Sequence, residues 1–391
     1  MKYPERDSIN SMFLYNPLEL TINGPPGSGK TTLIKKLINR LSVKYRLGYV
    51  KHAKHAIDTD REGKDTWIAR EAGAERIFFK GPLNSADEEP PRGKSGIQDD
   101  WALMGTDDSI PDATRAAMIE KDAVLIESFE FLNTPRIVVL DKDEKMLCKV
   151  LDGSCARVAA CVGQDADVPQ LQGIVPYFNR DDIGGIVYAI EGHWLRTAGT
   201  RPFHGLVLAG GSSSRMGTDK AALPIDNQAL CDRTADLLSG YCDTCYVSCR
   251  HDQANSKPRS SHPCIPDRLL NFGPMGGIIT ALLSHPEASW MVTACDMPGL
   301  ESDILAPLIS RRNPFKAATA YCSSLSASPE PLCTIYEPKS VFFLIPWIAR
   351  GDYSLKNALD NMDIERFLLK DSRDLKSINT PSEYRKFRNR Q

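Results

Sequence analysis

The sequence predicts an α/β protein of two domains, and two glycine-rich turns are the main observations behind that prediction. The first turn lies at residues 24–29 and the second at residues 210–217, and each follows a short apolar run and precedes a helical pattern. A strand, a phosphate-binding turn and a helix, in that order, open a doubly wound and mainly parallel sheet. The length of 391 residues also fits two or three domains at roughly 150 residues each. Because the two turns differ in sequence, they indicate two unrelated nucleotide-binding domains.

Composition narrows the class of protein. The chain is 42% hydrophobic and 25% charged, which are ordinary globular values. Its 48 basic and 50 acidic side chains lack the basic excess typical of proteins that bind nucleic acid. No apolar run approaches the roughly 18 residues that a membrane span needs, and the first residues lack the apolar core of a signal peptide. We therefore expect a soluble, cytoplasmic protein with no nucleic-acid or membrane partner.

Cysteines are numerous but mostly far apart. Eleven are present, a number and spacing that suit a reducing compartment better than a disulfide framework. One close cluster joins Cys242, Cys245 and Cys249, and His251 would complete a set of four zinc ligands. The cluster also lies on an alternating, strand-like stretch, where a thiol is an acceptable buried side chain. We favour this second interpretation.

Apolar runs of strand length recur through the first half of the chain, with helical patterns between them. The runs that predict strands lie at residues 18–23, 46–50, 123–127, 136–140, 158–162 and 174–177. A closing helix is expected at residues 182–194, and the acidic, proline-rich stretch 84–100 is expected to form a loop. These patterns place a first domain at residues 1–195 and a linker at residues 196–202.

The second half shows the same alternation of strand and helix patterns. Strands are predicted at residues 204–209, 244–248 and 290–294, and the polar stretch 255–266 is predicted to be a loop. Short connections between strands and helices favour a mainly parallel sheet here as well. The second domain is therefore placed at residues 203–391.

The first turn has the spacing of a P-loop, which predicts a P-loop NTPase fold for the N-terminal domain. Its glycines allow backbone N–H groups to surround a phosphate, and the helix that follows adds the positive end of its dipole. Lys30 would neutralise the β- and γ-phosphates, and the Thr31 hydroxyl would ligate Mg²⁺. Glu127 ends a neighbouring apolar strand, where a carboxylate can reach the magnesium shell. The candidate nucleotide-binding residues are Gly24, Gly27, Ser28, Gly29, Lys30, Thr31 and Thr32.

A second charged stretch, residues 50–66, directly follows a predicted strand. It contains His52 and His55 together with several aspartates and lysines. After a strand of a doubly wound sheet, such a stretch would face the P-loop. From composition alone, a solvated charged loop is the favoured interpretation.

The N-terminal half resembles the small GTP-binding proteins of molybdopterin guanine dinucleotide synthesis, the MobB family. The resemblance is carried by the P-loop, by KHAKHAIDTDREGKDTWIAREAGA, by WALM at residues 101–104 and by LIESFEF, and it covers roughly residues 17–195. Where the family usually has Glu-Gly, this chain has Glu127-Ser128. The resemblance implies that GTP is the nucleotide and that Thr31 and Glu127 lie on its magnesium side. No NKxD motif for guanine is evident, so the guanine preference rests on the resemblance.

The second turn carries cations as well as glycines. Gly210 and Gly211 directly follow a buried strand and allow the backbone to approach a nucleotide closely. Arg215 and Lys220 then bring two positive charges onto the same loop. Two cations suit a triphosphate whose pyrophosphate must leave with negative charge, so both are candidate catalytic residues.

The C-terminal half resembles the MobA family, the molybdenum cofactor guanylyltransferases. After the second turn come Asp267, GPMGG at 273–277, ACDMP at 294–298, EPL at 330–332 and NTP at 379–381, in the family's order over roughly residues 203–388. The resemblance implies a Rossmann-like nucleotidyltransferase (GT-A-like) fold and transfer of GMP from GTP to molybdopterin. It makes Asp296 a catalytic residue and Mg²⁺ ligand, and Asp267 a base or ribose contact. The candidate nucleotide-binding residues are Leu208, Ala209, Gly210, Gly211, Lys220, Asp267 and Asp296.

Two further segments of the C-terminal half have simpler interpretations. The glycines of residues 273–277 would let a loop close over substrate without Cβ clashes. The Asn379-Thr-Pro sequence is interpreted as a turn before a final helix.

Three functions are compatible with these observations. The first is a bifunctional cofactor-synthesis protein, in which a guanylyltransferase is fused to its GTP-binding partner domain. The second keeps the folds but changes the substrate, as in a cytidylyltransferase or a sugar-phosphate nucleotidyltransferase. In the third, the first domain is an adaptor that delivers the cofactor to apo-enzymes or works with other cofactor-synthesis proteins.

Overall fold

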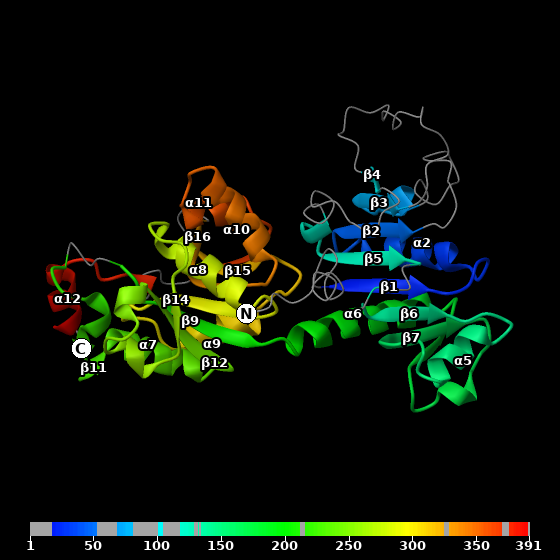
Figure 1. The fold of residues 1–391 in the computed structure, drawn as a ribbon, viewed down its shortest axis with the longest axis horizontal. Coiled ribbons are helices and arrows are strands. Elements are labelled where there is room, and N and C mark those ends of the chain that lie inside the picture. The colour runs from blue at the N-terminus through cyan, green and yellow to red at the C-terminus, as the bar shows by residue number, and fades with distance from the viewer. Residues whose placement is uncertain are drawn as a thin grey trace. The chain divides into compact units, whose positions relative to one another are not determined.

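The structure is a computed structural model that describes residues 18–52, 69–80, 101–104, 118–128, 132, 134–211, 216–323, 328–369 and 375–389. The chain divides into two compact units between Gly199 and Thr200, and each unit has its own sheet (Figure 1). The predicted loop at 84–100, His55 and Arg215 lie outside the described residues. Within those ranges, no helix combines the length and apolar character needed to cross a membrane.

The N-terminal unit is built on an eight-stranded sheet in the order β4-β3-β2-β5-β1-β6-β7-β8. Its pairings are all parallel, as the sequence predicts. Ile22 of β1 pairs with Glu127 of β5, so the two strands end side by side. The strands are β1 (Glu19–Asn23), β2 (Leu47–His52), β3 (Arg76–Lys80), β4 (Trp101–Met104), β5 (Ala123–Glu127), β6 (Arg136–Val139), β7 (Val158–Gly163) and β8 (Tyr177–Asn179).

Helices α2 (Lys30–Leu41) and α6 (Ile183–Gly199) pack against each other in this unit, and α5 (Lys145–Leu151) follows β6. On α2 the buried side chains include Leu33, Ile34, Leu37, Ile38 and Leu41, which form one apolar stripe at helical spacing. Trp194 of α6 is fully buried and meets Tyr45 edge to face.

The last strand of this unit differs from the sequence prediction. Residues 174–176 do not form a strand, because the short 3-10 helix η1 (Pro169–Leu171) turns the chain and the N–H groups of Ile174 and Val175 donate to the Leu171 carbonyl. Strand β8 begins only at Tyr177. Helix α6 continues to Gly199, into the segment predicted as a linker, and the next strand begins at Phe203.

The C-terminal unit has a seven-stranded sheet in the order β13-β12-β9-β14-β16-β15-β17. Most pairings are parallel, but β16 runs antiparallel to both of its neighbours. The two residues Ser248 and Ala294 pair with the same Leu208, so β12, β9 and β14 end together. The strands are β9 (Phe203–Leu208), β12 (Thr244–Cys249), β13 (Cys264–Pro266), β14 (Ser289–Ala294), β15 (Ala318–Ser323), β16 (Pro329–Tyr336) and β17 (Ile364–Leu369), with a small hairpin of β10 (Pro224–Ile225) and β11 (Gln228–Ala229).

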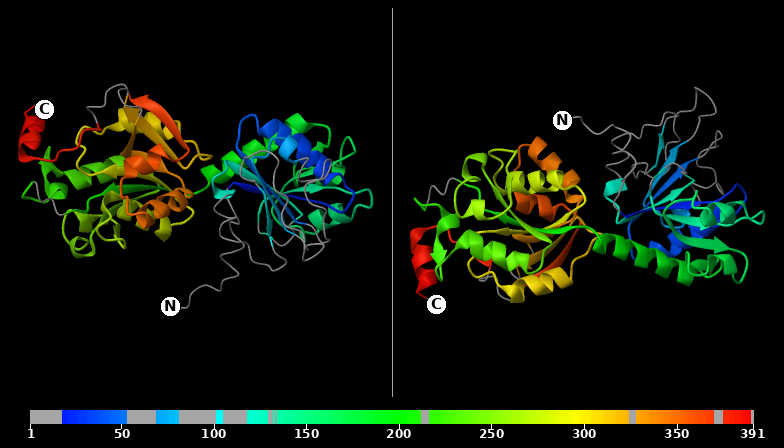
Figure 2. Two further views of the ribbon diagram at one scale, coloured as in Figure 1. Left: turned by 90° about the horizontal axis from the view of Figure 1, so that it is seen from above. Right: turned by 60° about the horizontal axis from the view of Figure 1, so that its bottom comes forward.

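Helices cover both faces of this sheet (Figure 2). Successive side chains of a strand point to opposite faces, so Trp290 and Val292 pack in one apolar cluster and Met291 in another. The first cluster includes residues of α8, α10 and α11, and the second includes residues of α7 and α9. The helices are α7 (Leu230–Ser239), α8 (Gly273–Ser284), α9 (Ser302–Ser310), α10 (Ser340–Ala349), α11 (Leu355–Asp360) and α12 (Pro381–Arg388).

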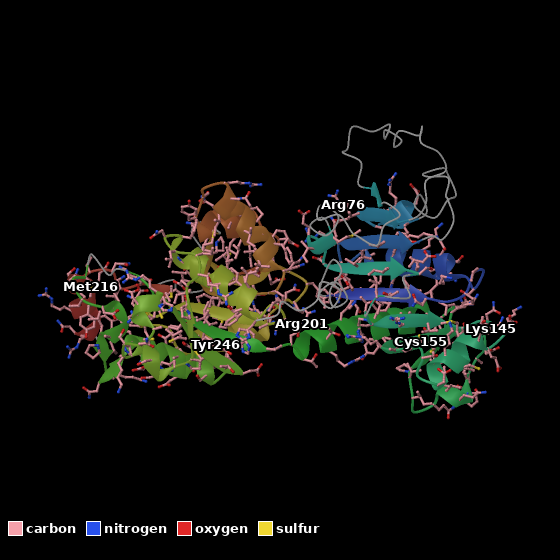
Figure 3. The ribbon with its side chains drawn as sticks, viewed as in Figure 1. Arg76, Lys145, Cys155, Arg201, Met216 and Tyr246 are labelled. Atoms are coloured by element: carbon pink, nitrogen blue, oxygen red, sulfur yellow. The ribbon has the colours of Figure 1, made fainter. Side chains whose placement is uncertain are left out.

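An aromatic cluster closes the amino ends of the central strands. Tyr246 of β12, labelled in Figure 3, has its ring within 6 Å of the rings of His285 and Trp290. His204 of β9 packs edge to face against all three rings. Burial and the neighbouring His285 keep the pKa of His204 below its ordinary value.

Three sequence interpretations are revised or refined here. The predicted loop 255–266 ends in strand β13, which adds an edge to the sheet beside β12. Residues 273–277 are the first turn of α8 rather than a closing loop. Cys245 and Cys249 are buried on β12, and burial raises the pKa of both thiols to about 12.

Gly276 allows α8 to approach the chain that precedes it. A Cβ at this position would lie 2.4 Å from the Leu269 carbonyl oxygen, a backbone atom that cannot move alone. We expect Gly276→Ala to lower the free energy of unfolding by about 1–3 kcal/mol through this overpacking. Gly240→Ala is the control, because its Cβ would meet only an ordinary 3.4 Å contact. Equal urea midpoints for the two variants would contradict the expected strain.

Candidate functional site

The first candidate site is the P-loop between β1 and α2. Gly29 has a φ of 87°, in the left-handed region that favours glycine, and it is the N-cap of α2. The Lys30 ammonium donates to the carbonyl oxygens of Gly24 and Pro25, at 2.7 Å each. The backbone of the loop therefore holds the Lys30 ammonium. The ammonium lies next to the N-terminus of α2, which would face a phosphate.

The structure brings together the two residues predicted on the magnesium side of the P-loop. The Thr31 hydroxyl donates to Glu127 Oε1 at 3.0 Å, across the boundary between the P-loop and β5. Lys51 Nζ lies 3.4 Å from the same oxygen, and the Tyr49 hydroxyl donates to the other carboxylate oxygen. Glu127 is only 3% exposed, so these partners satisfy a carboxylate that water hardly reaches.

Sequence reasoning missed Tyr49 and Lys51, although a signal was available. They are two residues apart on β2, so their side chains share one face of the sheet. Strand β2 pairs with β5, and Lys51 is the partner of Glu127. The side chain of His52 lies outside the described part of the structure.

Arg180 also contacts the P-loop and was missed. It follows β8, two strands away from β6, and its Nη2 donates to the Ser28 carbonyl at 3.0 Å. Nothing in the local sequence indicates this contact, because the two residues are far apart in the chain.

The second candidate site is a cavity of about 810 Å³ at the carboxyl ends of β9, β12 and β14. It brings together the predicted residues Leu208, Ala209, Gly210, Gly211, Lys220, Asp267 and Asp296. Arg215, the other predicted cation, lies outside the described part of the chain, but Met216 beyond it is buried (Figure 3). The cavity is further lined by Asp219, Ala221, Ser248, Arg250, Leu269, Leu270, Asn271, Gly273, Pro274, Gly277, Ala294, Cys295, Leu332, Ser377 and Asn379.

Lys220 and Asp296 form an ion pair in this cavity. The ammonium lies 2.8 Å from Asp296 Oδ2, and both side chains are less than one-fifth exposed. Asn379 Oδ1 accepts a second hydrogen bond from the same ammonium at 2.7 Å. The Ile378 N–H donates to the Asp296 carbonyl oxygen at 2.8 Å, which holds the C-terminal segment against the site.

The turn predicted around Asn379 is present, but it also contributes to the cavity. The Thr380 side chain caps α12 and forms a capping box with Glu383. Sequence reasoning assigned Asn379 to the turn alone and missed its contact with Lys220. That contact spans 159 residues, so local sequence could not indicate it.

Asp267 also lines the cavity, and the Ser248 hydroxyl donates to its Oδ1 at 2.6 Å. Burial raises the pKa of Asp267 above its ordinary value, and the Ser248 hydrogen bond opposes this shift. Gly277 of α8 leaves room for the pair, because a Cβ there would lie 2.4 Å from Ser248 Oγ.

Arg259 is the second residue that sequence reasoning missed in this unit. It lies in the segment predicted as a loop, yet its side chain is fully buried. It donates to the Ala209 carbonyl oxygen and to both carboxylate oxygens of Asp219. This guanidinium holds the pKa of Asp219 below its ordinary value.

The acidic residues of both sites are spread out. In the part of the chain that the structure describes, histidine, cysteine and acidic side chains form no group of three or more that could hold a metal ion. Each site instead offers one carboxylate beside a lysine, Glu127 with Lys51 and Asp296 with Lys220. A Mg²⁺ ion at such a site would take its other oxygen ligands from phosphate and water, which is how nucleotide sites usually bind it.

Comparison with known proteins identifies both halves of the chain. Residues 205–366 match the MobA-like NTP transferase domain, and residues 20–162 match molybdopterin guanine dinucleotide synthesis protein B. A probable molybdenum cofactor guanylyltransferase from Synechococcus elongatus is 31% identical over 192 residues, which are 46% of this chain and 96% of that protein.

Two further proteins are also similar to parts of this chain. A molybdenum cofactor biosynthesis bifunctional protein from a Synechocystis species is 33% identical over 183 residues, which span 47% of this chain and about half (53%) of that protein. The crystal structure of molybdopterin-guanine dinucleotide biosynthesis protein A from Archaeoglobus fulgidus is 22% identical, with a TM-score of 0.41, and the match covers 48% of this chain and 97% of that one. Both resemblances predicted from the sequence are confirmed by the family matches. The chain belongs to the molybdenum cofactor guanylyltransferase family through its C-terminal half, and it carries a MobB domain in its N-terminal half.

Proposed function

We propose that this protein makes the guanine dinucleotide form of the molybdenum cofactor. The C-terminal domain transfers GMP from GTP to molybdopterin and releases pyrophosphate, and the N-terminal domain binds GTP as an accessory. The observation that carries this proposal is the Lys220–Asp296 pair, which lies at the carboxyl edge of the sheet in a cavity large enough for a nucleotide.

The transfer needs no nucleophile from the protein. An oxygen of the terminal phosphate of molybdopterin attacks the α-phosphorus of GTP, and the bond from that phosphorus to the β-phosphate oxygen breaks. The electron pair leaves with pyrophosphate. Lys220 forms an ion pair with Asp296. We therefore propose that Lys220 neutralises the negative charge that develops on the phosphates. Arg215 would act with it on the same loop, and the remaining acceleration comes from holding the two substrates in line.

The side-chain oxygens of both sites are suitable ligands for Mg²⁺. Asp296 would hold it in the second site, and Thr31 with Glu127 would hold it in the first, since carboxylate and hydroxyl oxygens are its preferred ligands. When bound, the ion supplies positive charge to the phosphate oxygens. Asp267 lies beside the start of the glycine loop, since a Cβ on Gly210 would lie 3.3 Å from its Oδ2. By the family resemblance, we assign Asp267 to the base or ribose.

The accessory role of the N-terminal domain rests on its P-loop and on the family match. GTP bound there would couple cofactor synthesis to apo-enzymes or to other proteins of the same synthesis, in the cytoplasm. Joining the two domains in one chain raises their effective concentration to the millimolar range for a short linker. The alternative substrates, CTP or a sugar phosphate, are less favoured because relatives that are 31% identical over this half of the chain are named guanylyltransferases. Incubation with molybdopterin, Mg²⁺ and each nucleoside triphosphate separately, with detection of pyrophosphate and product, tests the choice.

Asp296→Asn should keep the fold but lower turnover by two or more orders of magnitude, roughly 3 kcal/mol of transition-state stabilisation. The amide occupies the same space but adds no negative charge to hold Mg²⁺. Raising Mg²⁺ should restore part of the activity. Lys220→Ala should bind GTP more weakly, react more slowly and respond little to Mg²⁺. Steady-state kinetics at several Mg²⁺ concentrations measure both variants, and near-normal turnover of Asp296→Asn at low Mg²⁺ would move the metal to another carboxylate such as Asp267.

Lys30→Ala should remove GTP binding from the first site and leave guanylyl transfer unchanged. The reason is that each phosphate loop has its own strand and helix and lies in its own compact unit. Equilibrium binding should show one GTP fewer per chain, while the turnover number stays within about twofold of wild type. Lys36→Ala is the control, because Lys36 lies on the same helix in an exposed pair with Asp181. A parallel loss of transfer activity in Lys30→Ala alone would rule out independent sites.

Asp267→Asn should weaken GTP binding but stabilise the fold near neutral pH. The folded-state pKa of Asp267 is raised, so the wild type loses stability as pH rises from the unfolded-state value of about 4 through the folded-state pKa. An amide escapes this loss and still accepts the Ser248 hydrogen bond. Urea unfolding at pH 7.5 should therefore favour the variant, and the difference should shrink at pH 4. A variant that is equally destabilised at both pH values would refute the assignment of the shift to burial.

A further inference from the structure

One segment of the chain, which contains Gln253 and Arg259, makes hydrogen bonds in and beside the glycine loop of the second site, residues 210–217. Arg259 donates from Nε and Nη2 to the Ala209 carbonyl oxygen, at 3.0 and 2.7 Å, just before the loop. It also donates from Nη1 and Nη2 to the Asp219 carboxylate, at 2.6 and 2.8 Å, just after the loop. Gln253, from the same segment, donates from Nε2 to the Gly211 carbonyl oxygen at 3.2 Å. The two ends of the loop are thus joined through a single guanidinium.

The arginine is well suited to this arrangement. Its side chain is 2% exposed, and His262, three residues later, is fixed to Asp232 of α7 at 2.7 Å. A planar guanidinium presents several N–H donors at fixed angles, so it can hold a carbonyl and a carboxylate at once. A lysine ammonium could reach only part of this set in a fixed geometry. Such a bidentate pair is stronger and more directional than a simple ion pair.

The charge of Asp219 gives the contact a consequence for substrate. Asp219 lines the cavity and precedes Lys220, and its side chain is 38% exposed. A free carboxylate at this position would repel the triphosphate that the cavity is proposed to bind. The guanidinium of Arg259 donates to both oxygens of this carboxylate and offsets its charge. Asp219 also caps the short helix η2 (Lys220–Ala222) by accepting from the Ala221 N–H.

We infer that Arg259 is a positioning residue for guanylyl transfer, which fixes Ala209 and Asp219 on either side of the glycine loop and offsets the charge of Asp219 toward the triphosphate. It is not among the described residues that line the cavity, so it acts through Ala209 and Asp219. The inference rests on the proposed function, because it concerns how the second site binds GTP.

The test uses the full chain carrying Lys30→Ala, so that GTP titration reports the second site alone. In this background, Arg259→Met should raise the Kd and KM for GTP at least tenfold and lower kcat by a smaller factor. The Kd and KM of Arg259→Lys for GTP should lie between those of the parent chain and those of Arg259→Met. Adding Asp219→Asn to Arg259→Met should recover several-fold of the GTP affinity, because it removes the uncompensated negative charge. Arg233→Met is the control, since Arg233 pairs with Asp226 and Glu301 outside the cavity.

Each outcome decides the inference. An unchanged Kd for GTP in folded Arg259→Met would overturn it, and so would a double variant that binds no better than Arg259→Met, because a purely structural role predicts no recovery. If Arg259→Met fails to fold, Arg259→Lys decides in its place, and an affinity equal to wild type would again overturn the inference. A parent chain that binds GTP but transfers no GMP would instead reject the proposed function, while the binding comparison would still stand.

Discussion

Parallel strand pairing determines which residues can meet in both domains, because parallel strands end at the same edge of a sheet. In the N-terminal unit, the pairing of Ile22 with Glu127 places the P-loop directly beside the carboxylate that its threonine contacts. In the C-terminal unit, Leu208 is paired with Ser248 on one side and Ala294 on the other. The glycine loop, the Asp267 region and Asp296 therefore converge although they are widely separated in sequence. A shift of one residue in either register would turn these side chains to the opposite face.

Both sites hold a lysine against a carboxylate, and this pairing has a physical purpose. A buried carboxylate without a partner is costly, and a buried ion pair adds little net stability once desolvation is counted. The Lys51–Glu127 and Lys220–Asp296 pairs therefore add little net stability, which agrees with the binding roles proposed for them. In each pair the two charges are already desolvated and oriented before substrate arrives. Phosphate oxygens and a metal ion can then exchange with existing partners, so little reorganisation is needed during the reaction.

The sequence predicted those parts of the fold and sites that depend on local patterns. A strand, a glycine turn and a helix are contiguous, so both phosphate loops and the ends of β5 and β14 could be located from the sequence. The antiparallel β16 was not predicted, since pairing direction depends on neighbours that only the fold brings together. Arg259 and Asn379 were missed for the same reason, as their partners lie 40 to 50 and 159 residues away. Arg259 was further hidden by its polar, proline-containing surroundings, which are typical of an exposed loop.

The two phosphate loops also need different support. The P-loop runs straight into the twelve-residue helix α2, with Gly29 as its N-cap, so the helix and Lys30 fix the loop from within. The glycine loop of the second site leads only into the three-residue helix η2, which is too short to supply a comparable dipole or anchor. The residues on either side of this loop are instead held by tertiary contacts, since Arg259 bonds to Ala209 and Asp219, and Asn379 accepts from Lys220. In this unit, side chains that are distant in sequence thus hold Lys220 and the residues that flank the loop in place.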